Sequence, residues 1–206
     1  MKKTGLAISL HLWIVLILVG SGLAQNKPSD PKKQFPLELS FFNHAVSMPF
    51  DGVVMSPLHP GISIGTEYGY TEGRLGRIFQ NLHVGYYHNK YNAKALFLKT
   101  EGGYRYTTGF GLFGELSLGL GYLHSFHPRE IFAMNAQGEY ERVKDKGKAA
   151  VIFLGALGAG YDFSRRVGWP VSLFIRYQPF IQTPYSIESS VLPQSMVHFG
   201  VRVQLW

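Results

Sequence analysis

The segment 197–205 alternates between apolar and polar side chains, and this period of two constrains the fold more than any other feature. Its apolar positions are Val197, Phe199, Val201, Val203 and Leu205, and its polar or small positions are His198, Gly200, Arg202 and Gln204. Successive side chains of a β-strand point to opposite faces. The segment therefore predicts a strand with one oily face and one polar face.

Similar stretches, separated by turn residues, occupy the chain beyond residue 35, where no window has sustained helical periodicity. The expected strands span 36–44, 61–70, 77–88, 94–106, 110–124, 149–163, 170–182 and 195–206. The 24 glycines, 12 tyrosines and 15 phenylalanines also suit curved sheets. The chain is thus expected to be all-β, but alternation alone does not separate a soluble sandwich from a membrane barrel.

The composition of the two strand faces favours the membrane barrel. The apolar faces are long, and tyrosines stand at their ends, as in the aromatic girdles of membrane barrels: Tyr68, Tyr70, Tyr86, Tyr104, Tyr106, Tyr122, Tyr161 and Tyr177. The polar faces carry glycines and ionisable residues: Glu38, Glu67, His83, Lys99, Glu101, Arg105, Glu115, Asp162, Arg176, His198 and Arg202. We predict an antiparallel up-and-down transmembrane β-barrel of about eight strands, with these ionisable residues in its lumen.

The predicted lumen is nearly neutral, with five acids and four bases besides the two histidines. A barrel of eight strands is only wide enough for its own side chains, so ionisable groups inside it should be paired. This balance predicts a structural polar network and argues against transport through the barrel.

The predicted connections alternate in length. They are short at 71–76, 107–109 and 164–169 and longer at 45–60, 125–148 and 183–194, whereas the link at 89–93 is a tight turn on the long-loop side. An even strand number places both ends of the barrel on the short-turn, periplasmic side, so the longer loops should face outward.

The N-terminus predicts export. Residues 1–24 combine Lys2 and Lys3, an apolar stretch and small residues at Gly22 and Ala24, which is typical of a cleaved signal peptide; an uncleaved membrane anchor is the alternative. Residues 25–35 should form a flexible leader and residues 36–206 the barrel. The chain has no cysteine, which excludes disulfides and a lipid-modified N-terminal cysteine.

The signal peptide, the alternating strands and the aromatic C-terminus together resemble the small OmpA-like and OmpX-like outer-membrane β-barrels. The resemblance covers the whole mature chain and implies location in the cell outer membrane. It also implies that the barrel-assembly machinery reads the last strand, through Phe199, Val201, Val203, Leu205 and Trp206. Trp206 departs from the pattern, because it lies on the parity opposite to Leu205.

The outward loops offer two candidate chemistries. The outer end of the fifth predicted strand carries His124, Ser125 and His127, a nucleophile with imidazole bases nearby, as ester hydrolysis requires. His124 could pair with Ser125, and Glu130 or Glu139 could orient the imidazole. Small barrels that deacylate lipid A work with His and Ser two apart on one strand face, whereas these residues are adjacent. The scattered histidines of the loops have no metal-ligand spacing, so neither metal nor cofactor is expected.

Two outward segments could meet partners. Residues 45–60 are unusually apolar and should either fold over the barrel mouth or contact a protein or lipid. In the connection before 149, Arg142, Lys144, Lys146 and Lys148 could meet lipopolysaccharide phosphates. The formal charge of +7 lacks the clustered basic stripe that nucleic-acid binding needs.

The sequence thus predicts a non-enzymatic outer-membrane protein of a Gram-negative cell envelope, structural or an accessory subunit of an envelope complex. It would act through its outward loops and lipid face, and its expected partners are outer-membrane lipids, lipopolysaccharide and another envelope protein. The alternatives are a lipid-modifying hydrolase of the lipid A deacylase type and a soluble β-sandwich or lipocalin-like binder, whose oily faces would turn inward.

Overall fold

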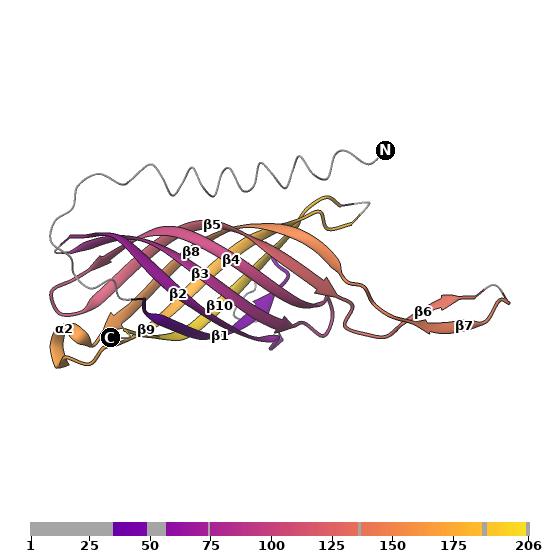
Figure 1. Cartoon of the computed structure of the whole chain (residues 1–206), viewed down its shortest axis with the longest axis horizontal. Coiled ribbons are helices and arrows are strands. Elements are labelled where there is room, and N and C mark those ends of the chain that lie inside the picture. The colour runs from indigo at the N-terminus through magenta and orange to yellow at the C-terminus, as the bar shows by residue number, and fades with distance from the viewer. Residues whose placement is uncertain (1–34, 49–56, 74, 136, 187–188, 205–206) are drawn as a thin grey trace. The chain divides into compact units, whose positions relative to one another are not determined.

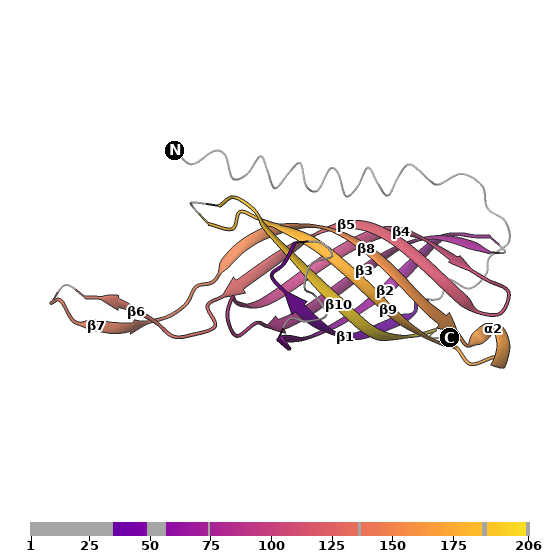
Figure 2. The same cartoon turned by 180° about the vertical axis from the view of Figure 1, so that it is seen from behind.

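A computed structural model describes residues 35–48, 57–73, 75–135, 137–186 and 189–204, and these form a closed antiparallel β-barrel (Figure 1). The barrel strands are β1 (Leu37–Ala45), β2 (Pro60–Glu72), β3 (Gly76–His88), β4 (Lys94–Thr107), β5 (Leu112–Phe126), β8 (Lys148–Asp162), β9 (Val171–Thr183) and β10 (Leu192–Val203). Each strand pairs with its neighbours in the chain order, and β1 closes the barrel by pairing with β10 from Leu37↔Val203 to Ala45↔Ser195. The view from behind shows the same closed wall (Figure 2).

The predicted fold class and its eight strands are confirmed, and most strand bounds agree within about two residues. Two elements were missed. The connection after β5 contains a two-stranded hairpin, β6 (Ile131–Met134) and β7 (Tyr140–Val143), and the turn after β8 contains the single helical turn α2 (Ser164–Val167). Both are too short for periodicity to reveal them. The predicted signal peptide and most of the predicted leader lie outside the described residues.

The tight link at 89–93 is held by Asn89. Its backbone amide donates to the carbonyl of Ala93 at 2.9 Å, and its side-chain oxygen accepts from the amides of Tyr91 and Asn92 at 3.0 and 3.1 Å. An asparagine side chain that replaces backbone partners in this way is a common means of closing a short turn.

The oily strand faces point away from the barrel interior. Leu118 is 71% exposed, and the same surface carries further large apolar side chains such as Ile64, Leu82, Leu98, Leu116, Phe153, Ile175 and Phe199. This orientation is the reverse of what a soluble sandwich or lipocalin-like binder requires. No helix among the described residues is long and apolar enough to cross a membrane.

The interior has two kinds of filling. One part is an apolar cluster that includes Phe42, Tyr87, Phe97, Leu123 and Ile152, all buried. The other is polar and charged, and it contains most of the ionisable residues that the sequence placed in the lumen. The polar part is described next, because it decides whether the barrel can conduct.

Candidate functional site in the lumen and at the long-loop mouth

The predicted lumen residues are buried inside the barrel, with the exception of Asp162. Relative exposures are at most 7% for Glu38, Glu67, His83, Lys99, Glu101, Arg105, Glu115, Arg176, His198 and Arg202. They come from β1, β2, β3, β4, β5, β9 and β10, so the network ties nearly all the barrel strands to one another.

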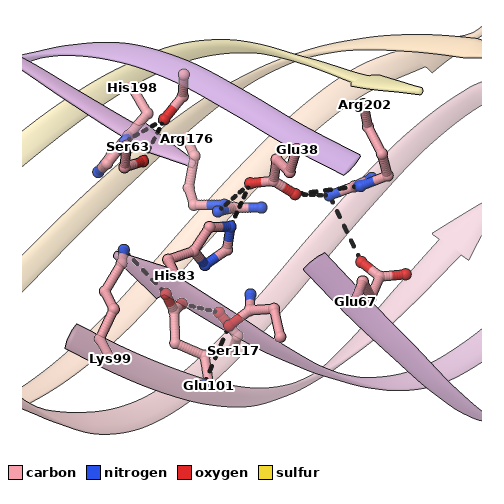
Figure 3. A network of polar contacts seen from close by, with 12 residues as sticks. Glu38, Ser63, Glu67, His83, Lys99, Glu101, Ser117, Arg176, His198 and Arg202 are labelled. Atoms are coloured by element: carbon pink, nitrogen blue, oxygen red, sulfur yellow. Dashed lines mark hydrogen bonds and ion pairs between the residues drawn. The ribbon is translucent and has the colours of Figure 1, made fainter. Parts of the chain in front are cut away.

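Acids and arginines alternate through the larger part of this network. Arg176 donates to Glu38 at 2.9 Å and to Glu115 at 2.7 Å. Arg105 donates to Glu115 at 2.9 Å, and Arg202 donates to Glu38 at 2.7 Å. Figure 3 shows Arg202 between Glu38 and Glu67, with the Glu67 carboxylate 3.6 Å from its guanidinium. Each buried charge is therefore compensated by hydrogen-bonded partners of opposite sign, as burial requires.

A second chain of contacts surrounds Lys99 and Glu101, whose charged groups are 3.0 Å apart. Ser117 donates to Glu101 at 2.8 Å, and the amide of Gln178 donates to Glu101 at 2.9 Å. His198 donates through Nε2 to Gln178 at 3.2 Å. Ser117 and Gln178 were not among the predicted lumen residues, which are all ionisable, although both lie on the inward parity of their strands.

Aromatic rings cover the guanidinium groups. Arg105 lies 4.6 Å from the ring centroid of Phe79, and Arg176 lies 4.8 Å from that of Phe174. Such contacts hold a guanidinium by its flat face while its edge donates to carboxylates. These phenylalanines occupy inward positions that were expected to be polar.

Asp162 does not join the network, because it stands at the end of β8. It is only half-buried, and its carboxylate accepts from the Ser164 amide at 3.0 Å and the Ser172 hydroxyl at 3.4 Å. Here the carboxylate stabilises the turn into α2.

Buried polar side chains also fill the barrel near its long-loop end. His44 donates through Nε2 to Gln194 at 2.7 Å, accepts at Nδ1 from Asn89 at 3.1 Å and stacks on Tyr87 at 4.1 Å between ring centroids. Gln194 in turn donates to Gln182 at 2.7 Å. These contacts connect β1, β3, β9 and β10 across the lumen and bind the 89–93 turn to the barrel.

His124 and Ser125 are not brought together. The strand β5 continues through Phe126, so their side chains leave on opposite faces. His124 accepts at Nδ1 from the Tyr122 hydroxyl at 2.9 Å and donates through Nε2 to the Lys146 carbonyl at 3.2 Å. Glu130 pairs instead with Arg142 at 3.0 Å, and Glu139 is exposed.

Ser125 shares a hollow at the long-loop end of the barrel with a different histidine, His127. The hollow is lined by Asn92, Ala93, Ser125, Phe126, His127, Lys148, Gln182, Tyr185 and Ser186. His127 donates through Nδ1 to Asp145 at 3.3 Å, while the Ser125 hydroxyl donates to the Lys148 carbonyl at 3.3 Å. Backbone amides of Gly147 and His127 also donate to Asp145 and lower the pKa of its carboxyl. In the sequence His127 stands two residues after Ser125.

Comparison with solved structures identifies the fold. Neisserial surface protein A superposes with a TM-score of 0.51 at 14% identity, over 83% of this chain and 97% of that one. The chain therefore has the fold of the eight-stranded outer-membrane barrels. Ail of Yersinia pestis matches with a TM-score of 0.48 at 6% identity, over 85% of this chain and 100% of Ail. The N-terminal barrel domain of Pseudomonas aeruginosa OprF matches with a TM-score of 0.44 at 17% identity, over 84% and 100%. No family model and no curated protein matches the chain.

The remaining predicted sites are described only in part. Phe199, Val201 and Val203 of the expected assembly signal face outward on β10, whereas Leu205 and Trp206 lie outside the described residues. Much of the apolar 45–60 segment is likewise undescribed. Its described flanks include the exposed Met48 and Leu58 and the buried His59, whose amide donates to Asn43 at 2.7 Å. Among the described residues, no three His, Cys, Asp or Glu side chains gather as a metal site would require.

Proposed function

We propose that this chain is a closed outer-membrane barrel that serves the Gram-negative cell envelope as a structural protein or as an accessory subunit of an envelope complex. It acts through its outward loops and lipid face and conducts no solute. Its partners are outer-membrane lipids and lipopolysaccharide, the barrel-assembly machinery that inserts it, and another envelope protein.

One observation carries this proposal: the ion-paired network in the lumen. Arg105, Arg176 and Arg202 alternate with Glu38, Glu67 and Glu115, and each of these side chains is at least 93% buried. Separating them to open a path would leave uncompensated charges in a low-dielectric interior, which is strongly unfavourable. The apolar outer surface supports membrane residence, because a soluble protein rarely exposes so large an oily area.

Membrane fractionation followed by electrophoresis of heated and unheated protein tests the proposal. We expect the chain in the outer membrane, faster migration without heating, and no stable large currents from reconstituted protein in planar bilayers. Recovery in the soluble fraction without a mobility shift, or large single-channel currents, would reject it.

A second candidate function is a lipid-modifying hydrolase of the lipid A deacylase type, favoured by the hollow that contains Ser125 and His127. In such a reaction the Ser125 oxygen would bond to the acyl carbonyl carbon while His127 took its proton. That proton would then pass to the departing alcohol, and water would release the acid. Asp145, already bonded to His127, would hold the imidazole in place. The Ser125 hydroxyl would first have to leave the Lys148 carbonyl.

Mass spectrometry of lipid A from strains that produce single variants separates the two candidates. If the chain is a hydrolase, Ser125→Ala and His127→Ala should both restore the acylated species, whereas His124→Ala, whose side chain leaves on the other face, should not. An identical lipid profile with and without the wild-type chain would reject the hydrolase.

A further inference from the structure

A second hollow lies at the base of the β6–β7 hairpin and is strongly basic. It is lined by Lys94, His127, Pro128, Arg129, Glu130, Ile131, Arg142, Val143, Lys144 and Asp145. Lys94 begins β4, whereas the other cations belong to the connection between β5 and β8. Two segments distant in the sequence thus contribute positive charge to one place.

The acids of this hollow already have partners. Glu130 forms an ion pair with Arg142 at 3.0 Å. Asp145 accepts from the backbone amides of His127 at 2.6 Å and Gly147 at 2.8 Å. Among the described residues, no acidic side chain pairs with Lys94, Arg129 or Lys144. Four cations therefore stand against two carboxylates around one hollow, which leaves a net charge of +2 there, and a concentration of like charge attracts a counter-ion of opposite sign.

From these contacts we infer that the hollow is a binding site for a phosphorylated saccharide. The planar guanidinium of Arg129 can donate two parallel hydrogen bonds to a phosphate, and the ammonium groups of Lys94 and Lys144 add point charges. Ile131 and Val143 face each other across the hairpin and offer an apolar surface beside the cations. A sugar ring has apolar C–H faces that suit such a surface, whereas a bare inorganic anion gains nothing from it.

The site differs from the basic run that the sequence suggested. Of the four basic residues near the end of that connection, Arg142 is paired with Glu130 and Lys148 donates to the Tyr185 carbonyl. Lys146 does not line the hollow, so only Lys144 of that run contributes a free charge. Lys94 and Arg129 complete the site, and the fold alone brings Lys94 there.

This inference rests on the proposed function, because it takes the long-loop end of the barrel to be the outward end. A phosphorylated saccharide at that end is either the headgroup of lipopolysaccharide in the surrounding leaflet or a soluble sugar phosphate. The shared chemistry is a phosphate ester on a sugar, and the two sources are separated by experiment.

Isothermal titration of the full chain, refolded in zwitterionic detergent, tests the site. The probes are purified lipopolysaccharide, glucose 1-phosphate, inorganic phosphate and uncharged glucose. Lipopolysaccharide or glucose 1-phosphate should bind more tightly than inorganic phosphate, and glucose should not bind. Binding of lipopolysaccharide alone would assign the site to the membrane headgroup, and binding of both would include the soluble source. Failure of both to bind, or equal affinity for inorganic phosphate, would overturn the inference.

A double variant tests the residues. Arg129→Gln/Lys144→Gln should weaken binding by about tenfold or more, since each substitution removes a charged side chain that donates hydrogen bonds to the ligand. The matched control is Arg165→Gln/Arg166→Gln in α2, which removes the same charge from exposed positions at the short-turn end. An equal loss of affinity in both double variants would show that binding depends only on the net charge of the protein, and it would reject the site. Unchanged heat-dependent migration of both doubles would show that the closed barrel survives, whatever the binding result.

Discussion

Arg105 and Glu67 form a two-point ion pair that passes over the lumen side of strand β3. Nη1 of Arg105 donates to Oε1 of Glu67 at 2.9 Å, and Nη2 donates to Oε2 at 2.5 Å. Glu67 belongs to β2 and Arg105 to β4, so the pair joins strands that do not pair with each other in the sheet. Arg105 also contacts Glu115 of β5. One guanidinium therefore links three strands of the wall.

Arg105→Leu should destabilise the barrel by about 3–5 kcal/mol, because it removes the two-point partner of the buried Glu67 and one of the two arginines that donate to Glu115. The measurement is urea unfolding in lipid vesicles, read from the heat-dependent gel shift. Arg166→Leu in the exposed helical turn is the control and should change the unfolding free energy by no more than about 0.5 kcal/mol. The double variant Arg105→Leu/Glu67→Leu should recover part of the loss. Equal stability of the Arg105 variant and the wild type would contradict the structural role of the network.

Gly119→Ala should destabilise the barrel, whereas Gly102→Ala should not. A Cβ at Gly119 would lie 2.2 Å from the carbonyl oxygen of Thr100 and 2.7 Å from Cγ of Glu101, both of which are fixed in the wall and its network. A Cβ at Gly102 would meet nothing within 4 Å. Overpacking of this kind costs about 1–3 kcal/mol. The same unfolding assay compares the two variants, and similar midpoints for both would mean that Gly119 is not closely packed.

Much of the fold was predictable because a barrel strand is encoded locally. Each strand repeats the period of two, and inward glutamates or arginines such as Glu38 and Arg176 mark the lumen face wherever they occur. The hairpin β6–β7 was missed, since strands of four residues carry too little alternation to stand out. The inward Phe79 and Phe174 were also missed, because parity alone does not say that a ring covers each guanidinium.

The sites at the mouth were less predictable, because they combine residues from several connections. The pairing of Asp145 with His127 depends on how the chain returns from β7 to β8. Lys94 reaches the basic hollow only because β4 and β5 are neighbours in the wall, from Lys94↔Phe126 onward. Sequence spacing gave no measure of either distance. The predicted strand ended at residue 124, whereas β5 continues through Phe126, so His124 and Ser125 leave on opposite faces.

Acidification should release the turn that Asp145 holds. Backbone amides of Gly147 and His127 hydrogen-bond to the carboxylate and lower its pKa below the ordinary value of 3.8. Because the carboxyl has a lower pKa in the folded turn than in the unfolded chain, its ionised form stabilises the turn at pH values above the unfolded pKa. This stabilisation is lost as the pH falls through the pKa of the folded state. The amide resonances of Gly147 and His127 should therefore shift together with a midpoint below 3.8, and the shift should be absent in Asp145→Asn. A midpoint at or above that value would show that the turn is not formed.

Leu118→Arg distinguishes a lipid-facing surface from a solvent-facing one. Leu118 lies in the middle of β5 and is 71% exposed. An arginine on the lipid face near the midplane costs a membrane barrel about 2–4 kcal/mol, whereas an exposed position in water tolerates the change within about 0.5 kcal/mol.

The control for Leu118→Arg is Tyr140→Arg in β7, which is 75% exposed on the hairpin outside the barrel wall. Both variants add one positive charge at an exposed position, on the barrel wall in one case and on the hairpin in the other. Unfolding in vesicles should show a loss for Leu118→Arg and none for Tyr140→Arg. If neither variant changes the unfolding free energy, the apolar face of β5 does not contact lipid. The proposed outer-membrane location would then lose its physical basis, because it depends on lipid covering this apolar surface.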